Sequence, residues 1–140
     1  MAFDPAKPRH ALPLAGETYE LIGSFELIEA VEYAMKEGVG KIAVSVVDGM
    51  PSHDLARLLS AIMTASGHKL SQKEAADILW NDVGLSGDEN NLLRLHLYSF
   101  LKICLSRPAD REATAKEMGE MLGELKALAA SPGKTTSDSA

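Results

Sequence analysis

The first stretch with residues that could do chemistry is GVGKI (38–42), which contains the glycine–lysine pair of a phosphate-binding loop. Such a loop cradles phosphates with backbone N–H groups, and it needs another glycine upstream and a hydroxyl after the lysine. Met35 and Ile42 stand at those two positions, and a helical pattern precedes the pair in place of a strand. The stretch therefore does not predict nucleotide binding.

A second stretch, DVGLSGDENNLL (82–93), spaces Asp82 and Asp88 around a glycine as in a calcium-binding loop. Calcium needs oxygen ligands at fixed positions, including a bidentate glutamate at the end of the loop. Gly84 and Leu93 occupy two of these positions and offer no side-chain oxygen. A turn between two helices is the expected structure.

The histidines and the single cysteine are the residues that could bind a metal or act as base and nucleophile. No two histidines are spaced as metal ligands, and Cys104 is not in a Cys-x-x-Cys motif. His96 and Cys104 share a helix face but lie about 12 Å apart along it, beyond hydrogen-bond reach. The other histidines are His10, His53 and His68. We therefore expect no catalytic residue, no metal site and no cofactor, and the protein is not predicted to be an enzyme.

The stretch LSQKEAADIL (70–79) has the form of the first helix of a DNA-binding helix-turn-helix. In that motif the N-terminal end of the second helix enters the major groove. Here the following stretch, SGDENNLL (86–93), would bring two acidic side chains against the phosphates. The chain as a whole carries a formal net charge of −6. We therefore expect a capped core helix and no binding of nucleic acid.

Length and composition are those of one globular domain. The 140 residues are 46% hydrophobic, which is enough for a normal core. No apolar run reaches the length of about 18 residues that indicates a membrane span, and the N-terminus lacks the apolar segment of a signal peptide. These features predict a cytoplasmic protein with no membrane contact. We expect an extended N-terminal arm at 1–15, a single helical domain at 16–130 and a disordered tail at 131–140.

The first elements after the arm are a short strand and a helix. GETYELIG (16–23) alternates in polarity as a half-buried strand does, and such a strand must pair with another segment or chain. Ser24 is placed to cap the helix that follows, and Gly38 is placed to end it. Residues 40–48 are readable as a strand or as a short helix, with helix favoured because the flanking segments are helical.

The rest of the chain is predicted to be helical. Ser71 with Glu74, and Ser86 with Glu89, have the spacing of capping boxes that open two helices. The second of these helices, through residue 105, is apolar over much of its circumference and is expected to be central. The predicted fold class is mainly α, about five helices with a minor β element near the N-terminus.

The last helix carries one apolar stripe that can be interpreted in two ways. The stripe either packs against the core of its own domain or forms an adaptable surface for a partner, since methionine repacks easily around different contacts. Phe25 is a further candidate for partner contact because it falls toward the polar side of its helix, and Trp80 is a secondary one. The stripe consists of Met118, Met121, Leu122, Leu125 and Leu128.

Two segments give the sequence a resemblance to a protein family. ETYELIGSFELIEAVEYAMKEGVGK (17–41) contains an alternating segment, a serine cap and an acidic helix that ends in glycines. DLARLLSAIMTASGHKLSQKEAADIL (54–79) contains a leucine-rich helix followed by a small polar turn. Over about residues 16–105 this order resembles the phage tail assembly chaperones, including related proteins of gene transfer agents. The stretch KIAVSVVDGMPSH (41–53) is longer and richer in β-branched residues than is usual in that family.

The resemblance implies a protein-binding role and no catalytic residue. It implies a small prophage or gene transfer agent protein in the cytoplasm of a bacterial host, which binds the tape-measure protein and keeps it soluble during tail assembly. Its partner would be the tape-measure or another tail protein, and a homo-oligomer stays open. The alternatives are a structural tail component retained in the particle, a small enzyme subunit, and a DNA-binding regulator.

Overall fold

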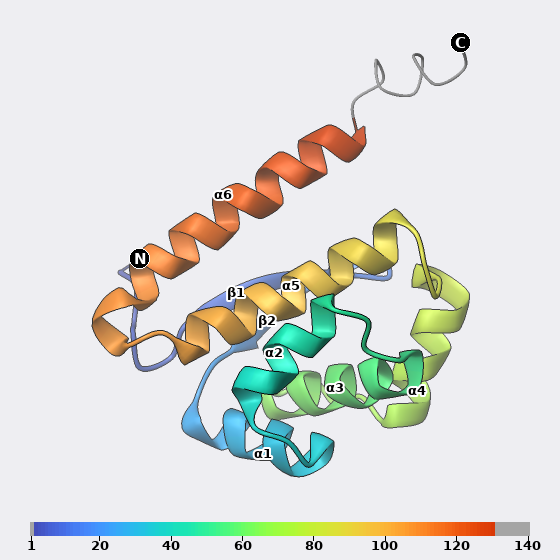
Figure 1. The fold of residues 1–140 in the computed structure, drawn as a ribbon, viewed down its shortest axis with the longest axis horizontal. Coiled ribbons are helices and arrows are strands. Elements are labelled where there is room, and N and C mark those ends of the chain that lie inside the picture. The colour runs from blue at the N-terminus through green and yellow to red at the C-terminus, as the bar shows by residue number, and fades with distance from the viewer. Residues whose placement is uncertain (1, 131–140) are drawn as a thin grey trace.

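The computed structural model describes residues 2–130 of the chain. Within them, six α-helices follow a two-stranded antiparallel sheet (Figure 1). The predicted fold class, mainly α with a minor β element near the N-terminus, is confirmed. The expected tail at 131–140 lies outside the described residues.

The predicted strand finds its partner in the N-terminal arm. Strand β2 (Glu17–Ile22) pairs with β1 (Arg9–Leu14) in an antiparallel hairpin. Ala15 and Gly16 connect them and both have positive φ, which matches the right-handed twist of the flanking strands. The second half of the arm is therefore part of the fold.

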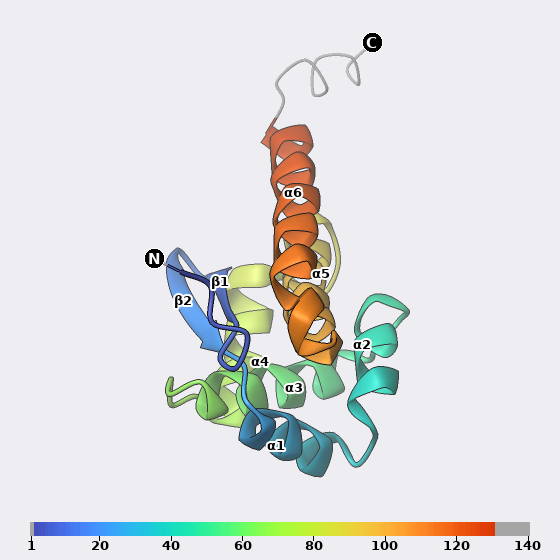
Figure 2. The same ribbon diagram turned by 90° about the vertical axis from the view of Figure 1, so that its left-hand side faces the viewer.

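One face of the hairpin joins the core. Leu12, Leu14 and Leu21 are buried, and β1 lies against α5 (Asp88–Leu105). Figure 2 shows the two strands side by side at one edge of the helices. His10 belongs to the same face of β1, because side chains two residues apart in a strand point the same way.

Helices α1 (Phe25–Met35) and α2 (Val39–Val47) follow the hairpin. The Ser24 hydroxyl caps α1 by accepting a hydrogen bond from the N–H of Leu27 at 3.0 Å, as predicted. The expected stop at Gly38 is wrong, because α1 ends earlier, at Lys36 in the left-handed conformation, and Gly38 precedes the first turn of α2. The helical alternative for residues 40–48 is the one the structure has, with α2 through Val47.

The next segment contains α3 (Ser52–Ala65), α4 (Gln72–Ile78) and the π-helical turn η1 (Leu79–Val83). The capping box of Ser71 and Glu74 is present in full, with N–H to oxygen distances of 3.0 and 2.8 Å. Both bonds form between residues three positions apart, so the sequence was sufficient to predict them.

The second predicted capping box, Ser86 with Glu89, is wrong. Helix α5 begins at Asp88 after Gly87, whose positive φ sets the turn, and no side chain caps its N-terminus. Instead the buried amide of Asn90 donates to the carbonyl oxygen of Gly84 at 2.9 Å and so ties the preceding loop to the helix.

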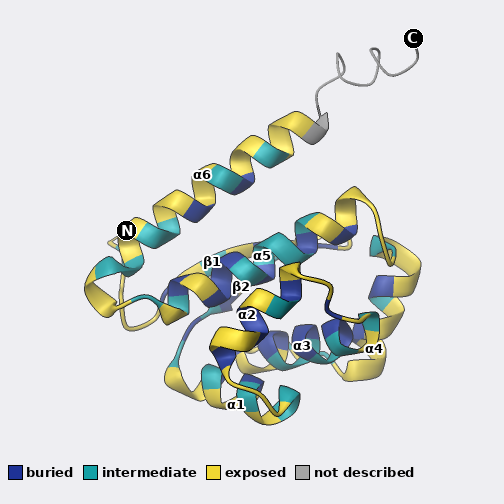
Figure 3. Cartoon of the chain, in the orientation of Figure 1, coloured by how far each residue is buried: buried dark blue, intermediate teal, exposed yellow. Residues whose placement is uncertain are grey.

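Helix α5 is central, as predicted, with α2, β1 and α6 (Arg111–Ala130) packed around it. The main hydrophobic cluster draws on the hairpin and on every helix from α1 to α5. No described residue of α6 belongs to that cluster, and most of this helix is exposed (Figure 3). Between residues 2 and 130, no helix is both long and apolar enough to cross a membrane.

Candidate functional site

Helix α6 lies on the outer face of α5 as an added arm. Among its described side chains Met118 and Leu122 are buried, 8% and 7% exposed, and Ile103 is the buried hydrophobic residue of α5 outside the main cluster. The main hydrophobic cluster thus forms without α6, and α6 is held by a separate apolar contact. A helix held in this way has apolar surface left over for another contact.

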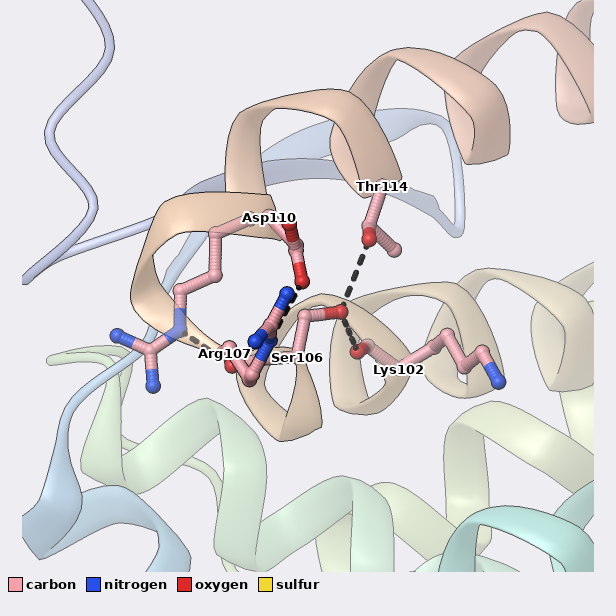
Figure 4. Close-up of polar contacts among 6 residues, drawn as sticks. Lys102, Ser106, Arg107, Asp110 and Thr114 are labelled. Carbon is pink, nitrogen blue, oxygen red and sulfur yellow. Dashed lines mark hydrogen bonds and ion pairs between the residues drawn. The ribbon is translucent and has the colours of Figure 1, made fainter.

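A polar network fixes the joint between the two helices (Figure 4). The short 3₁₀ helix η2 (Pro108–Asp110) connects them, and Arg107 donates to Asp110 across it at 2.9 Å. The Ser106 hydroxyl donates to the carbonyl oxygen of Lys102 at 3.0 Å and accepts from the Thr114 hydroxyl at 2.9 Å. The last turn of α5 and the first turn of α6 are therefore held in one geometry.

Arg111 adds further hydrogen bonds to the joint. Its guanidinium donates to three backbone oxygens, those of Ser106 at 3.2 Å, Cys104 at 3.2 Å and Pro5 at 2.7 Å. A planar guanidinium can serve several acceptors at once, and here it joins α6, α5 and the N-terminal segment. The angle between α5 and α6 is fixed at this end.

Away from the joint the two helices diverge (Figure 1). Side chains of both helices line a largely apolar depression there, which we call the wedge. The wedge has a volume of about 540 Å³, and Leu92, Leu95 and Leu125 on its walls are half-buried. It is lined by Asp88, Glu89, Asn91, Leu92 and Leu95 of α5 and by Leu125 and Lys126 of α6.

The predicted partner-binding residues divide between the packed and the open part of α6. Met118 and Leu122 are buried against the domain, so for these two the core interpretation of the stripe holds. Met121 and Leu125 are half-buried, and Leu128 is 58% exposed. The stripe therefore leaves the domain surface progressively toward its C-terminal end, because α6 diverges from α5.

Phe25 is 74% exposed, in agreement with its predicted position on the polar side of its helix. It does not lie at the wedge. It borders a second depression of about 390 Å³, which also includes Leu105 and Arg111 at the joint. Trp80, in η1, is also largely exposed but does not line either depression.

Sequence reasoning missed Leu92 and Leu95, which form the α5 wall of the wedge. The sequence does indicate apolar surface at these positions, because α5 is apolar over much of its circumference. A helix that is apolar on several faces must be covered on several faces. What the sequence did not provide was the crossing geometry that leaves this part of α5 uncovered.

A second feature missed by the sequence is a contact between two histidines. His10 Nε2 of β1 and His96 Nδ1 of α5 lie 3.0 Å apart, although 86 positions separate them in the chain. Burial and the neighbouring His96 lower the pKa of His10 from 6.5 to about 4, and burial followed by Lys126 lowers the pKa of His96. At neutral pH the two rings are therefore uncharged, with one donating a hydrogen bond to the other.

The remaining chemically reactive group is the Cys104 thiol. It is half-buried against the core, and burial raises its pKa to about 11 in spite of the nearby Arg111. The thiol is therefore protonated at neutral pH and is a weak nucleophile. Among residues 2–130, no three His, Cys, Asp or Glu side chains gather as a metal-binding group.

Comparisons of the chain with protein-family models, with curated proteins and with solved structures found no match.

Proposed function

We propose that this chain is a phage-derived tail assembly chaperone, of prophage or gene transfer agent origin, that binds helical apolar segments of a tape-measure protein. The observation that carries the proposal is the apolar wedge between α5 and α6, which the protein's own core does not fill. The resemblance over residues 16–105 supplies the identity of the partner.

The wedge suits recognition of a helix in a groove. A partner helix could seat apolar side chains spaced by three and four residues on Leu92, Leu95 and Leu125, and continue over Met121 and Leu128. Because the joint holds α6 at a fixed angle, little ordering of the groove would be needed on binding. The negative charge of the chain would keep the complex soluble.

Release would not require a nucleotide in this mechanism. A tape-measure protein is long, helical and apolar, and it is prone to aggregate until tube subunits polymerise around it. Tube subunits that bind the same apolar segments would displace the chaperone by competition. The wedge is open to solvent along one side, so a bound helix could leave without unfolding of the domain.

The test is co-expression with a phage tape-measure protein, scored by the soluble fraction of that protein. The variant is Leu92→Gln with Leu125→Gln, which removes apolar contact and leaves the charge unchanged. The matched control is Val44→Gln with Val47→Gln, two exposed apolar residues of α2. We expect the chain to raise the soluble fraction, the wedge variant to lose this effect and the control to keep it.

The proposal is wrong if the native chain leaves the tape-measure protein insoluble, or if the wedge variant works as well as the control. Circular dichroism of both variants establishes that they are folded. Detection of the chain in purified particles would assign it to the tail structure instead of to assembly.

A further inference from the structure

Apolar side chains line both walls of the wedge without closing it. Leu92 and Leu95 of α5 and Leu125 of α6 lie on these walls and are only half-buried. Removal of apolar surface from water is favourable. Contact between the two walls would therefore be favourable whenever no partner helix covers them.

The two walls also carry charges of opposite sign. Asp88 and Glu89 line the wedge from the first turn of α5, and Lys126 is the charged residue that lines it from α6. Lys126 is exposed, and no ion pair joins it to another residue between 2 and 130. Opposite charges attract across such a gap. Charge therefore favours the same approach of the walls as apolar contact does.

Gly123 gives α6 a weak point from which its end can bend. It lies inside the helix, where glycine is among the least favourable residues. Glycine is not required there by its neighbours, because a Cβ at this position would have open space around it among residues 2–130, nor by a positive φ. What glycine provides is an easily deformed turn, and helices bend at such positions.

This weak point separates the anchored part of α6 from its free end. The polar joint and the buried Met118 and Leu122 hold the first part of the helix against the domain. Gly123 follows Leu122 directly, and Leu125 and Lys126 come after it. A bend at Gly123 therefore moves these two side chains relative to α5 and leaves the joint unchanged.

We propose that the end of α6 from Gly123 onward is a lid that closes over the wedge when no partner helix occupies it. Closing brings Leu125 onto the two leucines of α5 and carries Lys126 toward the two carboxylates there. A partner helix and the closed lid compete for the same apolar wall, so the lid shields that wall until a partner arrives. This regulation rests on the proposed function for its partner helix, whereas the closing motion itself requires none.

The experiment measures the distance between two spin labels in the purified full-length chain by double electron–electron resonance. One label is placed through Ser86→Cys, before α5, and the other through Ala127→Cys, at an exposed position of the lid, in a Cys104→Ala background. A reference pair combines Ser86→Cys with Glu112→Cys near the joint. We expect a shorter and a longer distance for the first pair and a single distance for the reference pair.

One pair of variants tests the charge that closes the lid. Lys126→Gln should lower the ratio of short to long distances about two- to fivefold, and added salt should lower it in the native chain. Lys116→Gln is the matched control, because this lysine is also exposed on α6 but precedes the lid. It should leave the ratio unchanged.

A second pair of variants tests the bend. Gly123→Ala should lower the same ratio about fourfold, because alanine stabilises the straight helix. Gly119→Ala is the matched control. Gly119 also has open space around it among residues 2–130, but the buried Met118 and Leu122 hold the helix on both sides of it.

A single distance for the first label pair would overturn the proposed lid. So would a ratio that neither Lys126→Gln nor Gly123→Ala changes, or a control that changes it as much as its variant. A dimer in sedimentation that Gly123→Ala dissociates would also overturn it, because the glycine would then serve close packing of a second copy. The proposed function has a separate test, since a wedge that never closes would still raise the soluble fraction of the tape-measure protein.

Discussion

Acidification should destabilise this protein through the His10–His96 contact. In the unfolded chain His10 takes up a proton near its ordinary pKa of 6.5, whereas in the folded protein burial and His96 lower that pKa to about 4. Between these two values the unfolded state binds more protons than the folded state. Stability from this group is therefore fully present above pH 6.5, is lost as the pH falls, and changes no further below about pH 4.

The magnitude follows from the difference between the two pKa values. One pKa unit corresponds to about 1.4 kcal/mol, so lowering the pH from about 7.5 to about 4.5 should cost roughly 2–3 kcal/mol through His10. His96 contributes in the same direction, because its pKa is also lowered by burial and by Lys126 of α6. For a domain of this size such a loss is a large part of the total stability.

The assay is urea unfolding of the native chain and of His10→Gln at both pH values. Glutamine keeps a hydrogen-bonding group near His96 but does not titrate. The carboxylates are the same in both proteins, so the difference between their pH dependences isolates the contribution of His10. We expect the loss of unfolding free energy on acidification to be roughly 2–3 kcal/mol smaller in His10→Gln than in the native chain. His53→Gln, which removes an exposed imidazole on α3, is the matched control.

Equal pH dependence of the native chain and His10→Gln would refute this reasoning, because the His10 proton would then be bound equally in the folded and unfolded states. A histidine control that behaves like His10→Gln would refute it as well.

Three further substitutions test the packing and capping. Gly23→Ala should lower stability by about 1–3 kcal/mol, because the added Cβ would lie 2.7 Å from the Cys104 Sγ, and Cys104→Ala in the same chain should recover part of the loss in urea unfolding. Ser71→Ala should cost about 1 kcal/mol in urea unfolding, because the hydroxyl that accepts the N–H of Glu74 is lost, and unchanged stability would contradict the capping box. The pKa of Glu74 should rise only in part, because the backbone N–H of residue 71, the larger cause of its lowered pKa, still donates to the carboxylate. Ser99→Ala should preserve or raise the melting temperature, because the Ser99 hydroxyl is buried with no hydrogen-bond partner among residues 2–130; a lower melting temperature would mean that the hydroxyl is satisfied.

The sequence by itself determined the features that depend on neighbours a few positions apart. The Ser24 cap, the capping box of Ser71 and Glu74, and strand β2 are set by hydrogen bonds or side-chain alternation within one turn or one strand. The apolar stripe of α6 is equally local, since helical periodicity alone defines it. Ser86 and Glu89 have the spacing of a capping box, but the helix does not begin with them. Gly87 forms the turn and the buried Asn90 ties the preceding loop to the helix, so α5 begins at Asp88.

The tertiary structure alone decided which part of that stripe is available. Met118 and Leu122 are buried while Leu125 and Leu128 are not, because the joint at Ser106 and Arg111 sets the angle at which α6 leaves α5. The contact of His10 with His96 and the close approach of Gly23 to Cys104 likewise join distant parts of the chain. Periodicity specifies which face of an element is apolar, but it does not specify what covers that face.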